Sequence, residues 1–546
     1  MSARTSLLIP ALVVAAGVLI PLVYLVLRAS EAEPAVLRSL LLRERTLRLL
    51  VNTLVLTGGV IVLSTALALP MAWLSTRAAL PGRRWITLLG VLPLTMPAYV
   101  MAYVLLASTG ATGTLAQLFG LLTPRISGYW GALIALGLTT FPYLFLNLRA
   151  ALQGLDPALE ETAQSLGLRP TQVFVRIVLP QLRPAYYAGT LLVTLHVLGD
   201  FGVVSLMRFE TFSYALYVQY SAAYDRIYAA WLALMVLSLT IGALVMEARL
   251  LRGLAFHRAG TGAVRPARRV QLGRMAYPAY AFMGLLLVAS LILPLITIGY
   301  WVGADTAATS WGRLTEAMGR SLMASAPAAG LAGLLALPLA YLGVRYPSIW
   351  TRGLERIAYL GYAAPPLAFA LAYVFFSLRT VPVLYQTLAL LVMVYTLHFM
   401  AEALGPVRSA LYQASPRLEE AARSLGRSPL QAFFEVTFPL VRRGLLAGSA
   451  LVFLSAMKEL PLTFILSPPG FQTLAVSVWS STSEAVFSVA APYALVLILC
   501  SAAFVGLLLK DQADPSKRPS QPSKARHRSA RGADQDGPSA VAMEHP

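Results

Sequence analysis

The chain has 546 residues, of which 58% are hydrophobic and only 12% are charged, and its formal net charge is +19. Soluble domains carry about 25% charged residues, so the composition excludes a soluble globular protein as well as a disordered or collagen-like chain. A single cysteine, Cys500, excludes an internal disulfide framework. We therefore expect a polytopic membrane protein whose basic residues orient it in the bilayer and do not bind nucleic acid.

Apolar runs long enough to cross a bilayer, about 20 residues each, recur along the whole chain. They lie near 7–27, 51–75, 86–107, 130–148, 186–206, 228–248, 277–301, 321–344, 357–378, 384–404, 445–466 and 488–509. These runs predict an all-α polytopic membrane protein with twelve transmembrane helices. The first run exceeds the apolar core of a signal peptide, so residues 1–28 are interpreted as a retained N-terminal anchor helix.

The distribution of basic residues favours cytoplasmic N- and C-termini. With the N-terminus inside, the inner segments before the tail hold 24 Lys and Arg and the outer segments hold 11. Such an excess is typical of the cytoplasmic side of a membrane protein. Residues 510–546 have no apolar period and are expected to form a disordered cytoplasmic tail.

The chain also contains an internal repeat. Residues 149–189 match residues 408–448 at 18 of 41 positions without a gap. The repeat spans six helices, an even number, so both halves enter the membrane with the same polarity and form two parallel repeats. We predict halves at 29–250 and 276–509, joined by a cytoplasmic linker at 251–275.

The best-preserved part of the repeat is a polar segment between two spans, at 156–184 and again at 415–443. In each copy a polar residue before proline marks a helix start, two glutamates follow, and a glycine marks the helix end. Amphipathic connectors are the alternative, but a polar loop kept in both halves favours contact with a partner. The residues expected to make this contact are Glu160, Glu161, Ala163 and Gly167, with Glu419, Glu420, Ala422 and Gly426.

At these residues the sequence resembles a known family. The run Glu420-Ala-Ala ending at Gly426, with its copy Glu161-Thr-Ala ending at Gly167, is similar to the EAA loop of binding-protein-dependent ABC transporter permeases. The resemblance implies that the loops dock on two cytoplasmic ABC ATPase subunits. It also implies an extracytoplasmic solute-binding protein as partner and a bacterial inner (plasma) membrane location.

The segments that start at Gly199-Asp-Phe-Gly and Lys458-Glu-Leu-Pro resemble the fused, two-half permeases of the ferric-iron type. The resemblance implies a permease of an ABC importer with ferric iron as the expected solute. Another small solute, such as thiamine or a phosphonate, is the alternative within the family. A self-contained secondary transporter would also fit two parallel halves, but it leaves the repeated loops unexplained.

The sequence contains no Gly-x-x-x-x-Gly-Lys-Ser/Thr phosphate-binding loop, and none of its four lysines follows a glycine. We therefore expect ATP to be used by partner subunits. This chain is expected to be a non-catalytic membrane subunit that binds no cofactor and no resident metal.

Ionisable residues within spans are costly and require a role. His196 and Asp200 lie in one half, Lys458 and Glu459 in the other, and Asp200 aligns with Glu459 in the repeat. They are expected to line or gate the translocation pathway, or alternatively to form structural pairs.

Two further features of the spans carry predictions. His398 and Glu402 are four residues apart and are expected to pair inside the bundle. Prolines within spans are expected to kink the helices that shape the cavity. These are Pro70, Pro97, Pro142, Pro338, Pro365 and Pro366.

Overall fold

The computed structural model describes residues 3–31, 33, 38, 43–223, 226–252, 269–304 and 310–513. The chain divides into two units, Met1–Val505 and Gly506–Pro546, and the site described below lies in the first. Most of the predicted linker and nearly all of the predicted tail fall outside the described residues, so both remain predictions.

The first half consists of helices in the predicted order, interrupted by short breaks. They are α1 (Ala3–Ser30), α3 (Glu44–Thr76), α4 (Arg83–Val91), α5 (Ala98–Ser108), α6 (Thr114–Phe119), α7 (Gly128–Gly154), α8 (Pro157–Ser165), α9 (Pro170–Val173), α10 (Leu179–Gln181), α11 (Arg183–Gly199), α12 (Gly202–Leu206), α13 (Phe212–Val218) and α14 (Arg226–Leu251). Single 3₁₀ or π-helical turns join several of them.

The second half repeats this order. Its helices are α15 (Ala276–Leu287), α16 (Leu293–Ala304), α17 (Trp311–Arg345), α18 (Ile349–Ala363), α19 (Pro366–Thr380), α20 (Leu388–His398), α21 (Met400–Gln413), α22 (Pro416–Ser424), α23 (Pro429–Ala432), α24 (Phe438–Met457), α25 (Pro461–Leu466), α26 (Leu474–Ser483) and α27 (Phe487–Ala513).

Eight helices in the described part of the chain are long and apolar enough to cross a membrane, and three bent pairs raise the number to eleven. The twelfth predicted span, near 186–206, corresponds to α11, which has 17 residues and ends where the chain breaks at Asp200. The all-α membrane fold of two repeats is confirmed.

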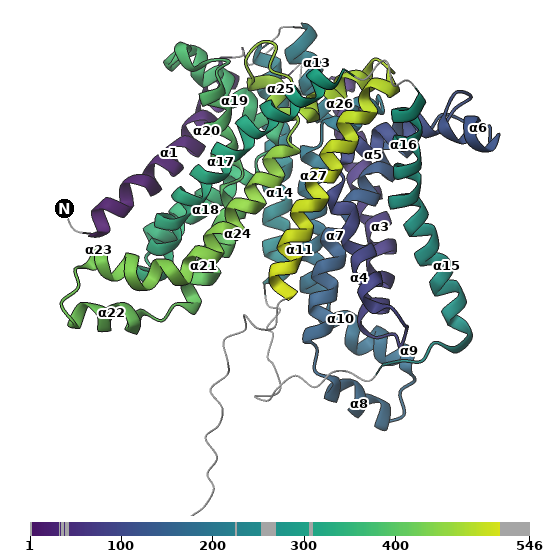
Figure 1. Ribbon diagram of the computed structural model, residues 1–546, viewed down its shortest axis with the longest axis horizontal. Coiled ribbons are helices and arrows are strands. Elements are labelled where there is room, and N and C mark those ends of the chain that lie inside the picture. The colour runs from purple at the N-terminus through teal and green to yellow at the C-terminus, as the bar shows by residue number, and fades with distance from the viewer. Residues whose placement is uncertain are drawn as a thin grey trace, which may run out of the picture. The chain divides into compact units, whose positions relative to one another are not determined.

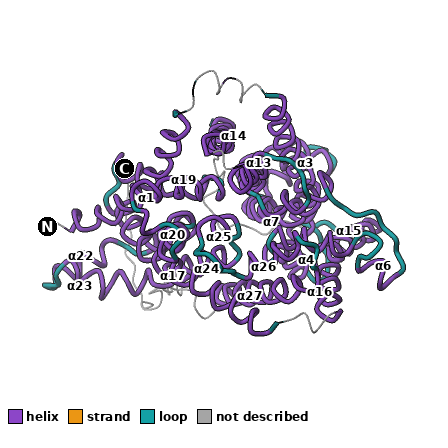
Figure 2. The backbone as a smooth tube through the Cα atoms, turned by 90° about the horizontal axis from the view of Figure 1, so that it is seen from above, coloured by secondary structure: helices purple, strands orange, loops and turns teal. Residues whose placement is uncertain are grey.

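The first span of each half packs against the other half. Helix α1 contacts α17, α18 and α19, whereas α15 and α16 contact α4 and α5, and Figure 2 shows both exchanges from above. The Tyr373 hydroxyl donates to the carbonyl oxygen of Gly17 at 2.6 Å, and the Trp301 indole donates to that of Ala107 at 3.2 Å. The two halves therefore form one packed unit.

The sequence of α1 explains its place in this unit. Val14, Val18 and Leu25 are fully buried at helical spacing, whereas Leu12 and Val13 are more than half exposed on another face. One face therefore packs on protein and the other is suited to lipid. That this helix is a retained anchor remains a prediction.

Three spans bend sharply near their middle. The bends measure 91° between α4 and α5, 106° between α18 and α19, and 49° between α20 and α21. Pro97 and Pro365 lie at the first two bends, where a residue without a backbone N–H cannot continue the helix. The predicted kink residues Pro70, Pro142 and Pro338 instead lie inside continuous helices.

Glycines let one pair of helices in each half approach closely. A Cβ at Gly448 on α24 would lie 2.8 Å from the carbonyl oxygen of Ala403 on α21, and one at Gly189 on α11 would lie 3.0 Å from the Cα of Leu144 on α7. Backbone cannot yield as a side chain can, so only glycine fits both positions. Small residues at helix contacts are a common device of membrane bundles.

We expect Gly448→Ala to lower stability by about 1–3 kcal/mol through overpacking. The matched control is Gly330→Ala on α17, where an added Cβ meets nothing within 4 Å. Thermal unfolding of the purified protein in detergent measures the difference. Equal melting temperatures for Gly448→Ala and the control would contradict this account of the contact.

Candidate functional site

The helix breaks surround a cavity of about 240 Å³ between the two halves. It is lined by the bend regions of both halves, by α7, and by the segments that follow α11 and α24. All four predicted pathway residues line this one cavity: His196, Asp200, Lys458 and Glu459. Irregular backbone is tolerated at membrane depth where it is buried in protein or lines a cavity.

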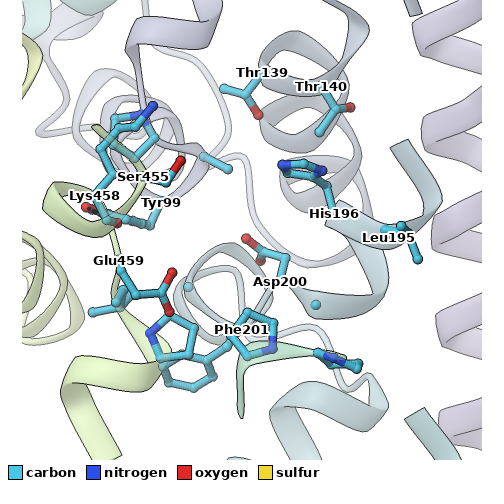
Figure 3. Close-up of a pocket in the computed structure, with 18 of the residues that line it drawn as sticks. Tyr99, Thr139, Thr140, Leu195, His196, Asp200, Phe201, Ser455, Lys458 and Glu459 are labelled. Carbon is cyan, nitrogen blue, oxygen red and sulfur yellow. Dashed lines mark hydrogen bonds between the residues drawn. The ribbon is translucent and has the colours of Figure 1, made fainter. Parts of the chain in front are cut away.

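Two carboxylates face each other from the two halves across this cavity (Figure 3). Asp200 Oδ1 accepts hydrogen bonds from the backbone N–H groups of Val203 at 2.9 Å and Val204 at 3.3 Å. Glu459 Oε1 accepts one from the N–H of Leu462 at 3.1 Å. Each carboxylate thus satisfies free donors at the start of a short helix, α12 or α25, that begins beside the cavity.

Lys458 connects the second half to the bend of the first. Its ammonium group donates to the carbonyl oxygen of Leu94 at 3.2 Å, and the Tyr99 hydroxyl donates to the carbonyl oxygen of Lys458 at 3.2 Å. Leu94 lies just before the 91° break, where carbonyl groups lose their helical partners. The ammonium group replaces one of those partners.

The neighbouring polar groups also pair within each half. The rings of His196 and Tyr143 lie 4.3 Å apart, centroid to centroid. In the second half the Ser455 hydroxyl donates to Glu402, with oxygen distances of 2.8 and 2.9 Å. The predicted pairing of Glu402 with His398 is therefore wrong: Glu402, which lies beyond the 49° bend between α20 and α21, bonds to Ser455, and none of the ion pairs among the described residues joins it to His398.

Four aromatic rings from the two halves form a cluster around Phe201, which lines the cavity. Phe201 and Tyr217 from the first half meet Phe464 and Trp479 from the second, with every pair of ring centroids within 6.3 Å. The Trp479 indole also donates to the Ser205 hydroxyl across the halves at 2.9 Å. Phe201 is the member of this aromatic cluster that lines the cavity, and through it the cluster connects the cavity to packing between the two halves.

The described ion pairs lie elsewhere, and none joins two of the four predicted pathway residues. Over the described residues, no group of three or more His, Cys, Asp or Glu side chains could hold a metal ion. The cavity thus presents side chains that bind the protein's own backbone and hydroxyl groups, together with free carboxylate oxygens.

The two predicted loops fold alike and lie at the same end of the helices, with α8 and α22 at the bottom of Figure 1. We call them the coupling loops, residues 156–184 and 415–443. Asp156 caps α8 by accepting from the N–H of Ala158 at 3.0 Å. Ser415 occupies the equivalent position before α22 but makes no side-chain cap bond. In both loops a π-helical turn follows the second short helix.

Glycine ends each coupling helix as the sequence predicts. Gly167 has a φ of 88° and Gly426 a φ of 87°, the left-handed region in which other residues are strained. The N–H of Leu168 bonds back to the carbonyl of Ala163 at 3.1 Å. The turn projects leucines outward, since Leu166 is 79% and Leu425 84% exposed.

The paired glutamates of each coupling helix differ in their surroundings. Glu161 and Glu420 are exposed. Glu160 instead forms an ion pair with Arg77, and Glu419 accepts from the Tyr341 hydroxyl at 2.8 Å and from Thr437. Consecutive residues on a helix point in different directions, so one glutamate of each pair faces outward and the other faces the transmembrane helices.

The structure is typical of a transport permease. It has two repeats, broken spans around a central cavity, and two loops with exposed leucines at one end. The family described as binding-protein-dependent transport system inner membrane component matches residues 64–256 and again residues 331–516. The chain belongs to this family and is the permease of an ABC importer. Its partners are therefore an ATPase and a binding protein, and the family places it in the inner membrane.

Individual relatives agree with this assignment. The chain is 33% identical over 496 residues to the Fe(3+)-transport system permease protein FbpB 2 of Haemophilus influenzae, covering 90% of this chain and 95% of the relative. It is 30% identical over 205 residues to a sulfate transport system permease protein of Salmonella typhimurium, covering 37% of this chain and 73% of the relative. A molybdenum transport system permease protein of Escherichia coli matches 24% of this chain and 58% of its own length, at 35% identity.

Sequence reasoning missed several residues of this site. Glu402 and Ser455 line the cavity, the aromatic cluster packs behind its lining residue Phe201, and Arg77 and Tyr341 contact the coupling helices. One signal was available for Arg77, because the run Ala68-Leu-Pro ending at Arg77 recurs as Ala336-Leu-Pro ending at Arg345. The aromatic cluster had no such signal, since its members lie far apart in the sequence.

We expect Gly167→Val and Gly426→Val together to reduce solute uptake strongly while the chain stays in the membrane. A β-branched residue at positive φ is strained by about 1–2 kcal/mol and would displace the coupling turn. Gly→Asn at both positions is the matched control, because asparagine tolerates this conformation. Uptake into cells, normalised to the amount of permease in the membrane, measures the effect. Wild-type uptake by the double Val variant would show that the turn geometry is dispensable.

Proposed function

We propose that this permease imports ferric iron delivered by an extracytoplasmic binding protein, and that two ATPase subunits drive it. The similarity to the Fe(3+)-transport system permease protein FbpB 2 extends over nearly the full length of both chains. The matches to the sulfate and molybdenum permeases extend over a smaller part of this chain.

The observation that carries the choice of solute is the excess of carboxylates in the cavity. Asp200, Glu402 and Glu459 line it together with a single ammonium group, that of Lys458. A pathway lined by carboxylates favours cations and disfavours oxyanions such as sulfate or molybdate. Among the described residues no group of three His, Cys, Asp or Glu side chains could hold a metal ion, so ferric iron would make weak, transient contacts and could leave the cavity.

The two coupling loops supply one docking surface for each of two ATPase subunits. Each loop exposes leucines, and each coupling helix exposes one glutamate of its pair, which suits a groove on a partner. Docking of the ATPases requires the loops to be cytoplasmic, and both termini would then be cytoplasmic as well. This orientation agrees with the excess of Lys and Arg predicted for the cytoplasmic side.

The aromatic cluster and the facing carboxylates would form the gate between the cavity and the binding protein. The elements that carry the cluster, α13, α25 and α26, lie at the end opposite α8 and α22 (Figure 1). Closure of the ATPases on ATP would draw the coupling loops together and separate the rings contributed by the two halves. Hydrolysis would reset the gate.

A strain that lacks this gene is expected to lose uptake of radiolabelled ferric iron and to recover it when the permease is supplied with its ATPase. Excess sulfate or molybdate should not compete. The permease alone in proteoliposomes should not accumulate iron on a proton or sodium gradient. Accumulation without the ATPase, or recovery of sulfate uptake instead of iron uptake, would overturn the proposal.

The double variant Asp200→Asn, Glu459→Gln is expected to lower ferric iron uptake at least roughly tenfold, about 1.4 kcal/mol in the transport barrier. Asn and Gln keep an oxygen that can cap α12 and α25, so the fold should persist while the negative charge is lost. Glu247→Gln, on α14 outside the cavity, is the matched control. The measurement is the rate of ferric iron uptake at equal amounts of permease in the membrane. A double variant that takes up iron as fast as the control would argue against a cation pathway through this cavity.

A further inference from the structure

The coupling helix of the first half is fastened to the membrane bundle by one buried ion pair. The Arg77 guanidinium lies 2.7 Å from Glu160 on α8, and the Arg77 side chain is only 7% exposed. Arg77 directly follows α3 and also donates to the carbonyl oxygen of Leu152 on α7 at 3.3 Å. Three helices therefore meet at this one side chain.

In the second half the equivalent glutamate also holds the coupling helix, but through hydrogen bonds from hydroxyl groups and not through an ion pair. Glu419 on α22 accepts from the Tyr341 hydroxyl on α17 at 2.8 Å, and from the Thr437 hydroxyl, next to α24, at 2.9 Å. Arg345, the repeat counterpart of Arg77, donates instead to the carbonyl oxygen of Ala414 at 2.7 Å. The position of the glutamate is preserved, and its partners are not.

The neighbouring glutamates point elsewhere. Glu161 and Glu420 are exposed, whereas Glu160 is only 22% exposed and Glu419 is half-buried. The second loop also contacts the bundle through the rings of Phe433 and Tyr341, whose centroids lie 5.6 Å apart. The glutamates, however, link the coupling helices themselves to the bundle, so a force applied to α8 or α22 can pass through these anchors to the end of α3 or to α17. The contact of Glu160 with Arg77 is an ion pair, and that of Glu419 with the Tyr341 hydroxyl is a hydrogen bond to a carboxylate. Interactions with an ionised partner are stronger than those between neutral groups.

We propose that Glu160 and Glu419 are positioning residues that transmit the movement of the coupling helices to the transmembrane helices, whereas Glu161 and Glu420 contact the ATPases. This inference rests on the proposed docking of an ATPase on each loop. Of the two adjacent glutamates in each loop, one would thus contact the transmembrane helices and the other the ATPase.

The two anchors differ in how they tolerate a change of charge. Glu160→Gln leaves the buried guanidinium of Arg77 without its counter-charge, which is unfavourable in a buried site. Glu419→Gln retains a carbonyl oxygen that can still accept from Tyr341 or Thr437. We therefore expect Glu160→Gln to be the more severe of the two.

The test uses the whole complex of permease, ATPase and binding protein in proteoliposomes, with ferric iron as solute. It measures ATPase co-purification, the stimulation of ATP hydrolysis by the binding protein, and ferric iron uptake per ATP. For Glu160→Gln we expect normal co-purification, with stimulation and uptake per ATP lowered at least about fivefold. Glu161→Gln and Glu420→Gln, the matched controls, should instead reduce co-purification.

Charge exchange keeps the test decisive if Glu160→Gln folds poorly. The double variant Arg77→Glu, Glu160→Arg is expected to regain stimulation that Arg77→Ala lacks. Two results would overturn the proposal. One is that Glu160→Gln reduces ATPase co-purification as Glu161→Gln does, and the other is that Glu160→Gln keeps normal stimulation of ATP hydrolysis by the binding protein.

A wrong choice of solute would give a different result from a wrong assignment of the anchors. If the wild-type complex hydrolyses ATP in response to the binding protein but takes up no iron, its solute is not ferric iron. In that case the stimulation ratio, which does not depend on the solute, still decides whether Glu160 and Glu419 act as anchors.

Discussion

The constraint on which this structure depends is that every backbone polar group inside a membrane needs a partner within the protein. Helices meet this requirement along their length, but a transport pathway needs breaks. This chain places its breaks around one cavity and satisfies the exposed groups with side chains. Asp200 and Glu459 accept from free N–H groups, and Lys458 donates to a free carbonyl. The polar lining of the cavity therefore also stabilises the broken helices.

The repeat supplies a symmetric scaffold with an asymmetric lining. Asp200 and Glu459 are equivalent and keep both their charge and their capping role. Other equivalent positions in the cavity, 259 residues apart in the sequence, have diverged, for example Thr139 and His398, Tyr143 and Glu402, His196 and Ser455, and Gly199 and Lys458. Both halves must keep the backbone geometry that forms the cavity. A single solute in that cavity does not require the same side chains on both sides.

The same division holds at the coupling loops, where geometry is preserved and chemistry is not. Both loops end their first helix at a glycine with nearly identical φ. The inward glutamate is held by Arg77 in one half and by two hydroxyl groups in the other. In the proposed docking, an ATPase subunit on either loop would meet a similar surface, although the contacts that hold the coupling helix behind it differ between the halves.

The sequence by itself determined the membrane fold, the parallel repeat and the coupling turns, because apolar length, periodicity and positive-φ glycines are local properties. It also singled out the in-span charges, because an ionisable residue in lipid is costly wherever it lies. It could not show that Glu402 binds Ser455 and not His398, that Phe201 meets Trp479, or that Glu160 turns inward to Arg77. These contacts join residues distant in the chain or lie across a helix break, so only the packing of the two halves decides them.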